Sequence, residues 1–230
     1  MPRLTHIHRA LEPRILAALG IVAAVLALFI ALADEVASGG THATDTAILM
    51  ALRAPQDPSQ TLGPAWVAEA VRDVSALGSP TVLGMLVAAC VVFLLLRRDL
   101  RTAAFVAAAT VSGAVASLLL KSAFARPRPD LVPHATTVFT ASFPSGHAML
   151  SAVVYLTLGA LLARITYGWW QKRYLMVLAV SLTAMIGASR VYLGVHWPSD
   201  VLAGWALGAA WALACWIFAQ LTGHERGRKT

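Results

Sequence analysis

Residues 143–163, FPSGHAMLSAVVYLTLGALLA, are the clearest indication of the fold that this chain is expected to adopt. It carries no Asp, Glu, Lys or Arg, and its one histidine, His147, lies near its start. A helix needs about 20 apolar residues to cross the hydrocarbon core of a membrane. Because backbone polar groups cannot remain unpaired in lipid, this run is predicted to be a transmembrane helix.

Similar apolar runs lie on both sides of this one. Hydrophobic residues make up 58% of the 230 residues and charged residues 13%, against roughly 45–50% and about 25% in soluble proteins. The chain is therefore predicted to be an all-α polytopic membrane protein that forms one domain over residues 1–230. In the last run, Gly204 and Gly208 are spaced for close helix packing. The six predicted spans are 15–33, 77–96, 102–120, 143–163, 174–190 and 201–221.

The basic residues predict how these spans are oriented. Twelve of the 18 Lys and Arg residues fall on one side of a six-span topology, which the positive-inside rule makes the cytoplasmic side. Both termini are then cytoplasmic, and the connection 34–76 lies outside. This arrangement accounts for the net charge of +7 without a nucleic-acid partner. The twelve residues are Arg3, Arg9, Arg14, Arg97, Arg98, Arg101, Arg164, Lys172, Arg173, Arg226, Arg228 and Lys229.

Two segments allow more than one interpretation. The first span follows a basic stretch and could be a cleaved signal peptide. Its apolar part is longer than the roughly 7–15 residues of such peptides, so a retained helix is favoured. The connection 34–76 is expected to hold two surface helices, one capped by Thr44 or Asp45 and one opened by Pro64. A lid over an outer site is the alternative.

Polar residues gather in three places where the predicted spans meet the outer side. Charged groups at membrane depth are costly, and they mark candidate functional sites. Three clusters that are distant in sequence but lie on the same side indicate one shared site. The clusters contain Lys121, Arg126 and Arg128; Pro144, Ser145, Gly146 and His147; and Ser189, Arg190, His196 and Asp200.

These residue types suit a phosphate group. Lys121, Arg128 and Arg190 are cations without a matching acidic cluster, and arginine can bind two phosphate oxygens at once. The helix expected to begin within residues 144–147 has free N–H groups at its first turn, which also favour an anion. Arg126 is interpreted as an ordinary interfacial charge.

A histidine and a carboxylate have the spacing of a nucleophile and the group that orients it. Asp200 follows His196 by four residues, so its carboxylate can fix the tautomer of the imidazole. His147 then remains to protonate a leaving group. A metal site built from these three residues is disfavoured because the neighbouring cations would repel a metal ion. No metal or other cofactor is expected.

In order and spacing, the motifs resemble the signature of the type 2 phosphatidic acid phosphatase (PAP2) superfamily. That signature reads K-x6-R-P, then P-S-G-H, then S-R-x5-H-x3-D. Residues 121–129, 144–147 and 189–200 match its three parts at every signature position. The six-span layout extends the resemblance over most of the chain.

The resemblance implies a PAP2/haloperoxidase-like helical core in the bacterial inner membrane. The implied activity is that of a metal-independent phosphatase for lipid phosphates or diphosphates, with an outward-facing site. His196 would be the nucleophile that forms a phosphohistidine, Asp200 would orient it, and His147 would be the general acid. The implied phosphate-binding residues are Lys121, Arg128, Ser145, Gly146 and Arg190.

Three other functions stay open at this point. The same residues could transfer phosphate from a prenyl diphosphate to another lipid. The vanadate-dependent haloperoxidases share the resemblance, but they are soluble and six apolar spans argue against them. The third alternative is a lipid-binding membrane protein without catalysis. A lipid phosphate and the bilayer are the predicted partners, and the candidate lipids are phosphatidic acid, phosphatidylglycerol phosphate and undecaprenyl diphosphate.

Overall fold

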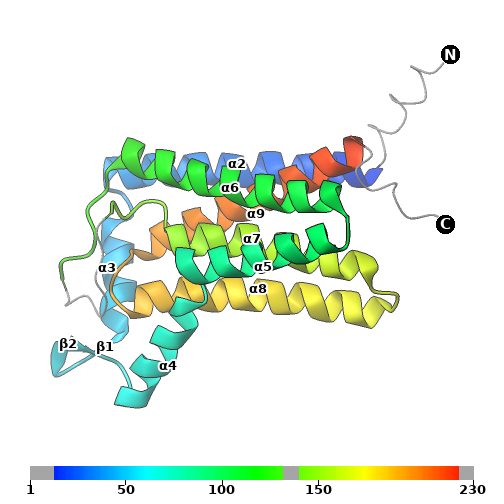
Figure 1. Cartoon of the computed structure of the whole chain (residues 1–230). Helices are drawn as coiled ribbons and strands as arrows, with labels where there is room; N and C mark the ends of the chain where they lie inside the picture. The colour runs from blue at the N-terminus through cyan, green and yellow to red at the C-terminus, as the bar shows by residue number, and fades with distance from the viewer. Residues whose placement is uncertain (1–12, 132–139, 223–230) are drawn as a thin grey trace.

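The computed structural model describes residues 13–131 and 140–222. Within these ranges the chain forms eight helices and one two-stranded antiparallel hairpin. The long helices run roughly side by side as a bundle (Figure 1). In chain order the elements are α2 (Pro13–Ser38), α3 (His42–Ala51), β1 (Arg53–Ala54), β2 (Asp57–Thr61), α4 (Ala65–Ala76), α5 (Pro80–Leu96), α6 (Leu100–Phe124), α7 (Gly146–Ile165), α8 (Trp169–Tyr192) and α9 (Pro198–Leu221).

The predicted spans are found as helices. Within the described residues, α2, α6, α7, α8 and α9 are each long and apolar enough to cross a membrane. Helix α5 has 17 residues, but it meets α4 at a bend of 44°, and the two together qualify as one broken span. The all-α membrane fold expected from the sequence is therefore confirmed.

Six predicted boundaries differ from the helix ends by three to five residues, and two of them are the starts of α7 and α8. The span predicted from residue 143 becomes helical only at Gly146, because the backbone of Ser145 at the N-cap is still extended. Helix α8 begins at Trp169 rather than at residue 174. Its first turns carry Trp169 and Arg173, whose guanidinium lies 4.5 Å from the Trp169 ring centre. Aromatic and basic side chains at a helix start are typical of a membrane interface.

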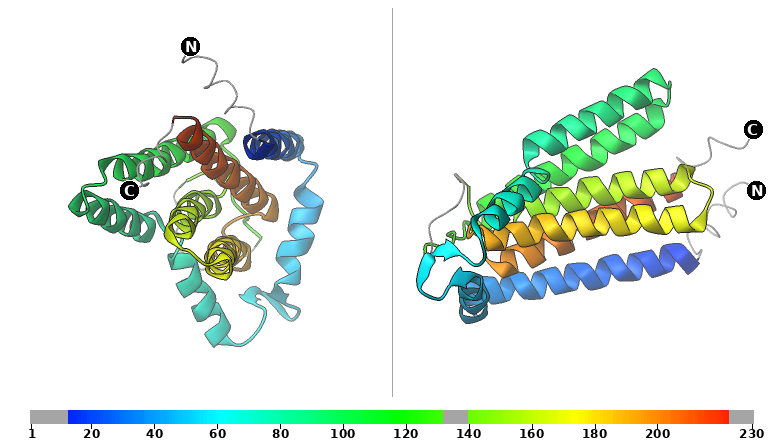
Figure 2. Two further views of the ribbon diagram at one scale, coloured as in Figure 1. Left: turned by 90° about the vertical axis from the view of Figure 1, so that its right-hand side faces the viewer. Right: turned by 90° about the horizontal axis from the view of Figure 1, so that it is seen from below.

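Helix α7 lies at the centre of the bundle, with the other long helices around it (Figure 2, left). It packs against α5, α6, α8 and α9. A Cβ atom on Gly204 would lie 2.7 Å from the carbonyl oxygen of Ser145, and one on Gly208 would lie 2.5 Å from that of Met149. The close packing expected of these glycines is confirmed, and it holds the first turn of α7 against α9.

Replacing Gly208 with alanine is expected to destabilise the protein by about 1–3 kcal/mol, because the new methyl group would meet backbone that cannot move aside. The measurement is the apparent Tm of the purified variant in detergent. Gly84→Ala is the matched control, since no atom of another described element lies within 4 Å of its added Cβ atom and alanine favours a helix. Equal Tm values for the two variants would contradict this prediction.

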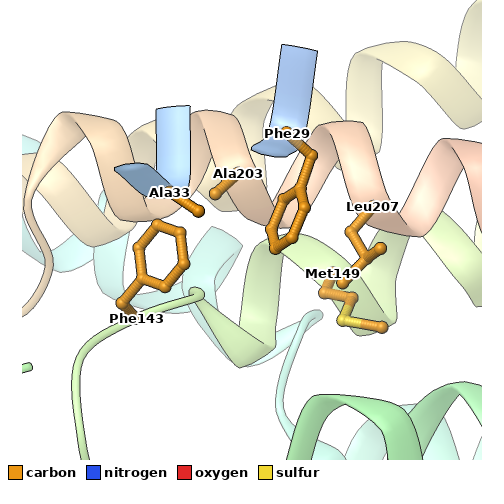
Figure 3. Close-up of a cluster of buried hydrophobic side chains, with 6 residues drawn as sticks. All are labelled: Phe29, Ala33, Phe143, Met149, Ala203 and Leu207. Atoms are coloured by element: carbon orange, nitrogen blue, oxygen red, sulfur yellow. The ribbon is translucent and has the colours of Figure 1, made fainter. Parts of the chain in front are cut away.

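A buried apolar cluster fastens α2 and the segment before α7 to the bundle. Figure 3 shows the rings of Phe29 from α2 and Phe143 from that segment beside Met149 of α7. Ala33 of α2 belongs to the same cluster, as do Ala203 and Leu207 of α9. The ring of Phe143 is fully buried, so the residues that lead into α7 have a fixed position.

The outer connection is more structured than the sequence predicts. Pro64 is the N-cap of α4, as expected. The expected cap at Thr44 or Asp45 is wrong, because α3 already begins at His42 and Asp45 lies buried in its first turn. The hairpin of β1 and β2, which pairs Arg53 with Thr61, was not expected. Together α3, the hairpin and α4 lie at one end of the bundle (Figure 1).

The opposite end of the bundle holds the start of α2, the end of α9 and the α5–α6 and α7–α8 connections (Figure 1). Those of the twelve basic residues that the structure describes therefore all belong to this one end, which the sequence predicts to be cytoplasmic. Five of the twelve lie outside the described residues, namely Arg3, Arg9, Arg226, Arg228 and Lys229. Which end faces the cytoplasm stays a prediction.

Candidate active site

The three polar clusters of the sequence meet at the end of the bundle that carries α3, the hairpin and α4. Lys121 stands in the last turn of α6, and Arg190 in the last turn of α8. His147 stands in the first turn of α7, and Asp200 in the first turn of α9. His196 lies in the connection between α8 and α9. Helix ends from four elements thus supply the candidate site.

His196 and Asp200 form a buried pair. The Nδ1 atom of His196 lies 3.3 Å from Oδ2 of Asp200, and both side chains are at most 2% exposed. The backbone N–H of Trp197 and the hydroxyl of Ser142 donate to the same Oδ2 atom. These donors hold the carboxylate at the imidazole, as the four-residue spacing predicts.

The partners of the imidazole define its tautomer. Nη1 of Arg128 lies 3.2 Å from Nε2 of His196, and an arginine can only donate. Nε2 must therefore carry the lone pair, while Nδ1–H donates to Asp200. Burial lowers the pKa of His196 to about 4, although the hydrogen bond and charge of Asp200 act in the opposite direction. At neutral pH the imidazole is uncharged, and its Nε2 atom is a potential nucleophile.

The basic side chains around this pair are fixed by the backbone. Lys121 Nζ donates to the carbonyl oxygen of Ala141 at 2.7 Å. Arg128 donates through Nε to the carbonyl oxygen of Thr140 and through Nη1 to that of Val195. These bonds hold two cations without neutralising them, which suits the binding of an anion.

Two buried polar atoms of the site lack a hydrogen-bond partner in the part of the chain that the structure describes. Arg190 donates through Nη1 to Ser75 Oγ at 2.9 Å, but its Nε atom has no hydrogen-bond partner within the described residues. The same is true of Ser145 Oγ, whose residue is fully buried. A buried polar atom without a partner is costly. A ligand oxygen could serve both atoms.

The start of α7 is tied to the rest of the site. The Ser145 N–H donates to the carbonyl oxygen of Asp200 at 2.9 Å, and a Cβ atom on Gly146 would lie 3.3 Å from Lys121 Cε. Gly146 therefore lets the lysine lie directly on the helix N-terminus. His147 follows, and Gly78 at the α4–α5 bend packs on its ring, since a Cβ there would lie 3.4 Å from Cδ2.

A cavity of about 580 Å³ opens beside the cations, between the end of α6 and the segment that leads toward α7. Its wall combines charged side chains with apolar groups of α6. The lining residues are Leu118, Lys121, Ser122, Ala125, Arg126, Pro127, Arg128, Thr140 and Ala141.

Arg126 is not the interfacial charge that the sequence suggests. Its side chain is 12% exposed, and it forms ion pairs with Asp200 at 2.6 Å and with Asp45 at 2.9 Å. Sequence reasoning also missed Asp45 and Ser75. Each comes from the outer connection and contacts a partner far away in the chain, so no local pattern marks either residue. Among the described residues, no three His, Cys, Asp or Glu side chains lie close enough to hold a metal ion.

Two curated relatives match part of the chain. Phosphatidylglycerophosphatase B of Bacillus subtilis is 39% identical over 93 residues, which are 39% of this chain and 44% of that protein. An undecaprenyl-diphosphatase of Sulfolobus acidocaldarius is 40% identical over 68 residues, which are 30% of this chain and 29% of that protein. The matches thus span less than half the length of either relative.

The fold is found in a solved structure. A transmembrane PAP2-type phosphatidylglycerolphosphate phosphatase from Bacillus subtilis superposes with a TM-score of 0.77 at 24% identity, covering 90% of this chain and 97% of that chain. At this identity the likeness concerns the fold. The sequence profile of the PAP2 superfamily matches residues 101–223, more than half of the chain and all three polar clusters. The chain belongs to the PAP2 superfamily.

Proposed function

We propose that this protein is a metal-independent phosphatase of lipid phosphates or diphosphates, working as one membrane-embedded unit over residues 1–230. The observation that carries the proposal is the His196 imidazole, which is uncharged, held through Nδ1 by Asp200, and carries its lone pair on Nε2 beside Arg128. A neutral nitrogen nucleophile among fixed cations fits attack on a phosphoryl group.

The phosphoryl group is proposed to bind between the cations and the start of α7. Lys121, Arg128 and Arg190 supply positive charge. Ser145 Oγ and Arg190 Nε, which have no hydrogen-bond partner among the described residues, supply contacts for its oxygens. Gly146 allows close approach at the helix N-terminus, whose N–H groups favour the anion. Charge that develops on the phosphoryl oxygens in the transition state is then stabilised by groups that need not move.

The reaction is proposed to proceed in two displacements. His196 Nε2 attacks phosphorus, the N–P bond forms, and the P–O bond to the lipid breaks while His147 gives a proton to the leaving oxygen. Water then attacks the phosphohistidine with His147 as the base, the N–P bond breaks, and inorganic phosphate leaves. The net change is lipid phosphate plus water to dephosphorylated lipid plus phosphate.

The substrate is proposed to be a lipid because the site lies at the ends of apolar helices and the adjoining cavity has both a charged and an apolar wall. The names of the relatives support phosphatidylglycerol phosphate and undecaprenyl diphosphate as candidates, beside phosphatidic acid. In the orientation predicted by the basic residues, the protein lies in the bacterial inner membrane with both termini in the cytoplasm and the site facing outward.

The test is phosphate release by the detergent-purified full chain from these three lipids and from a soluble aryl phosphate, with EDTA present. Release from at least one lipid that persists in EDTA is the expected result, and the ranking of kcat/KM identifies the preferred headgroup. Chromatography of the lipid products distinguishes hydrolysis from transfer to a second lipid. Loss of all activity in EDTA that returns with a divalent metal would contradict the proposal.

A further inference from the structure

The two oxygens of the Asp200 carboxylate have different neighbours. Oδ2 faces the site, where it accepts from Trp197 N–H and lies 3.3 Å from Nδ1 of His196. Oδ1 points away from the imidazole and accepts from Nη1 of Arg126 at 2.6 Å. The carboxylate is fully buried, so its orientation depends on these partners.

Arg126 is itself held in place by a second carboxylate. Its Nη2 atom donates to Oδ2 of Asp45 at 2.9 Å, and its Nη1 atom also donates to Oγ of Ser199 at 2.8 Å. Asp45 accepts in addition from the backbone N–H of Ser199 at 2.9 Å and from its hydroxyl at 2.6 Å. The contacts form a closed network between α3, the segment after α6 and the first turn of α9.

The charges in this network restrict the orientation and the protonation of its two carboxylates. Asp45 is 2% exposed and Asp200 is fully buried, and both contact the guanidinium of Arg126. Without this cation, two buried carboxylates would share one small region and repel each other, and one of them would take up a proton or turn away. Either change would disturb the hydrogen bond that Asp200 makes with the imidazole.

We propose that Arg126, held by Asp45, is a positioning residue of the active site that keeps Oδ2 of Asp200 aimed at His196 Nδ1. The role rests on the proposed function, since it concerns the orientation of the nucleophile. It also makes α3 a part of the site, because Asp45 is the contribution of the outer connection to this network. In this role Arg126 acts through Asp200.

The experiment is a double-mutant cycle between Arg126→Gln and Asp200→Asn, with kcat and KM measured on a lipid that the wild type hydrolyses. In the wild-type background, Arg126→Gln is expected to lower kcat about 10–100-fold, by analogy with the loss of groups that orient the ligands of a metal ion, and to leave KM within about threefold. In the Asp200→Asn background the same change is expected to cost less than about threefold, because the carboxylate to be held is gone.

Three more variants keep the result interpretable. Asp45→Asn is expected to lower kcat less than Arg126→Gln, and Arg126→Lys is expected to be intermediate, since it keeps the charge but loses the paired contacts. Asp57→Asn is the matched control on the same connection, because the Asp57 carboxylate accepts hydrogen bonds only from Ser59 and Gln60 among the described residues. It is expected to match the wild type.

Two outcomes would overturn the positioning role. One is an unchanged kcat in Arg126→Gln, and the other is an equal loss in both backgrounds, which marks a purely structural contribution and goes with a lower apparent Tm. If Arg126→Gln does not fold, the same comparison is made with Arg126→Lys and Asp45→Asn. A wild-type protein that releases no phosphate would overturn the proposed function instead, so the two failures are distinguishable.

Discussion

Replacing His196 with alanine is expected to lower phosphate release on the order of 10⁴-fold or more, while the protein still folds in the membrane. The imidazole is the proposed nucleophile, and its two ring nitrogens contact Asp200 and Arg128. Loss of a nucleophile removes the covalent route altogether, and the remaining rate comes only from binding and charge stabilisation. The measurement is kcat/KM on the preferred lipid, beside the apparent Tm.

A second readout follows the covalent intermediate directly. Wild-type protein quenched during turnover of ³²P-labelled lipid phosphate is expected to carry label that is stable in alkali and released by acid, as a phosphohistidine is. His196→Ala should carry none. His42→Ala is the matched control, because His42 is an exposed histidine whose ring meets that of Trp197 edge-on. It is expected to keep its label and its activity within a few-fold. Full turnover in His196→Ala would exclude this residue as the nucleophile.

The pH dependence supplies evidence without mutation. The folded pKa of His196, at about 4, lies below its ordinary value, so the nucleophile stays uncharged as the pH falls through 6.5. Once corrected for the second ionisation of the phosphate, with a pKa of about 6, kcat/KM is expected to show no acid-side fall between pH 6.5 and about pH 5, and to fall only nearer pH 4 as His196 takes up a proton. A corrected kcat/KM that already falls as the pH drops below 6.5 would indicate a nucleophile with the ordinary pKa of histidine instead.

Most of the helical bundle and the His196–Asp200 pair can be predicted from the sequence, because they depend on patterns among residues that are close together in the chain. Apolar run length predicts the spans, and the four-residue spacing brings His196, which lies just before α9, to Asp200 in the first turn of that helix. Pro64 marks the start of α4 for a similar reason, since proline suits the first turn of a helix. These features need no knowledge of the rest of the fold.

The outer connection could not be predicted in the same way. Arg126 reaches Asp45 across 81 residues, and Arg190 reaches Ser75 across 115 residues. A lone aspartate or serine in a polar connection belongs to no sequence pattern that indicates such a distant partner. Arg126, near a helix end, resembles an interfacial charge. The contacts arise only when the bundle has formed and the connection folds back over its end.

The effect of replacing His147 with glutamine is expected to depend on the leaving group. His147 stands in the first turn of α7, on the same end of the bundle as His196, and it is the proposed donor of the proton that the departing oxygen takes up. An alkoxide is a poor leaving group, so loss of the acid should lower kcat/KM, which reports the first displacement and not the shared hydrolysis of the phosphohistidine, about 10²–10⁴-fold on phosphatidic acid. An aryl phosphate loses a stable phenolate, and the same variant should cost less than about tenfold there.

A lipid diphosphate should fall between these two, because its leaving group is a phosphate ester that is already able to hold negative charge. Lys121→Gln is the contrasting variant: the lysine binds the phosphoryl group that all three substrates share, so its loss should lower their rates by similar factors. If His147→Gln also slows all three equally, the histidine binds phosphate and another group supplies the proton. A graded loss that follows leaving-group ability is expected only of the acid, and it assigns the role without assuming which lipid the protein meets in the cell.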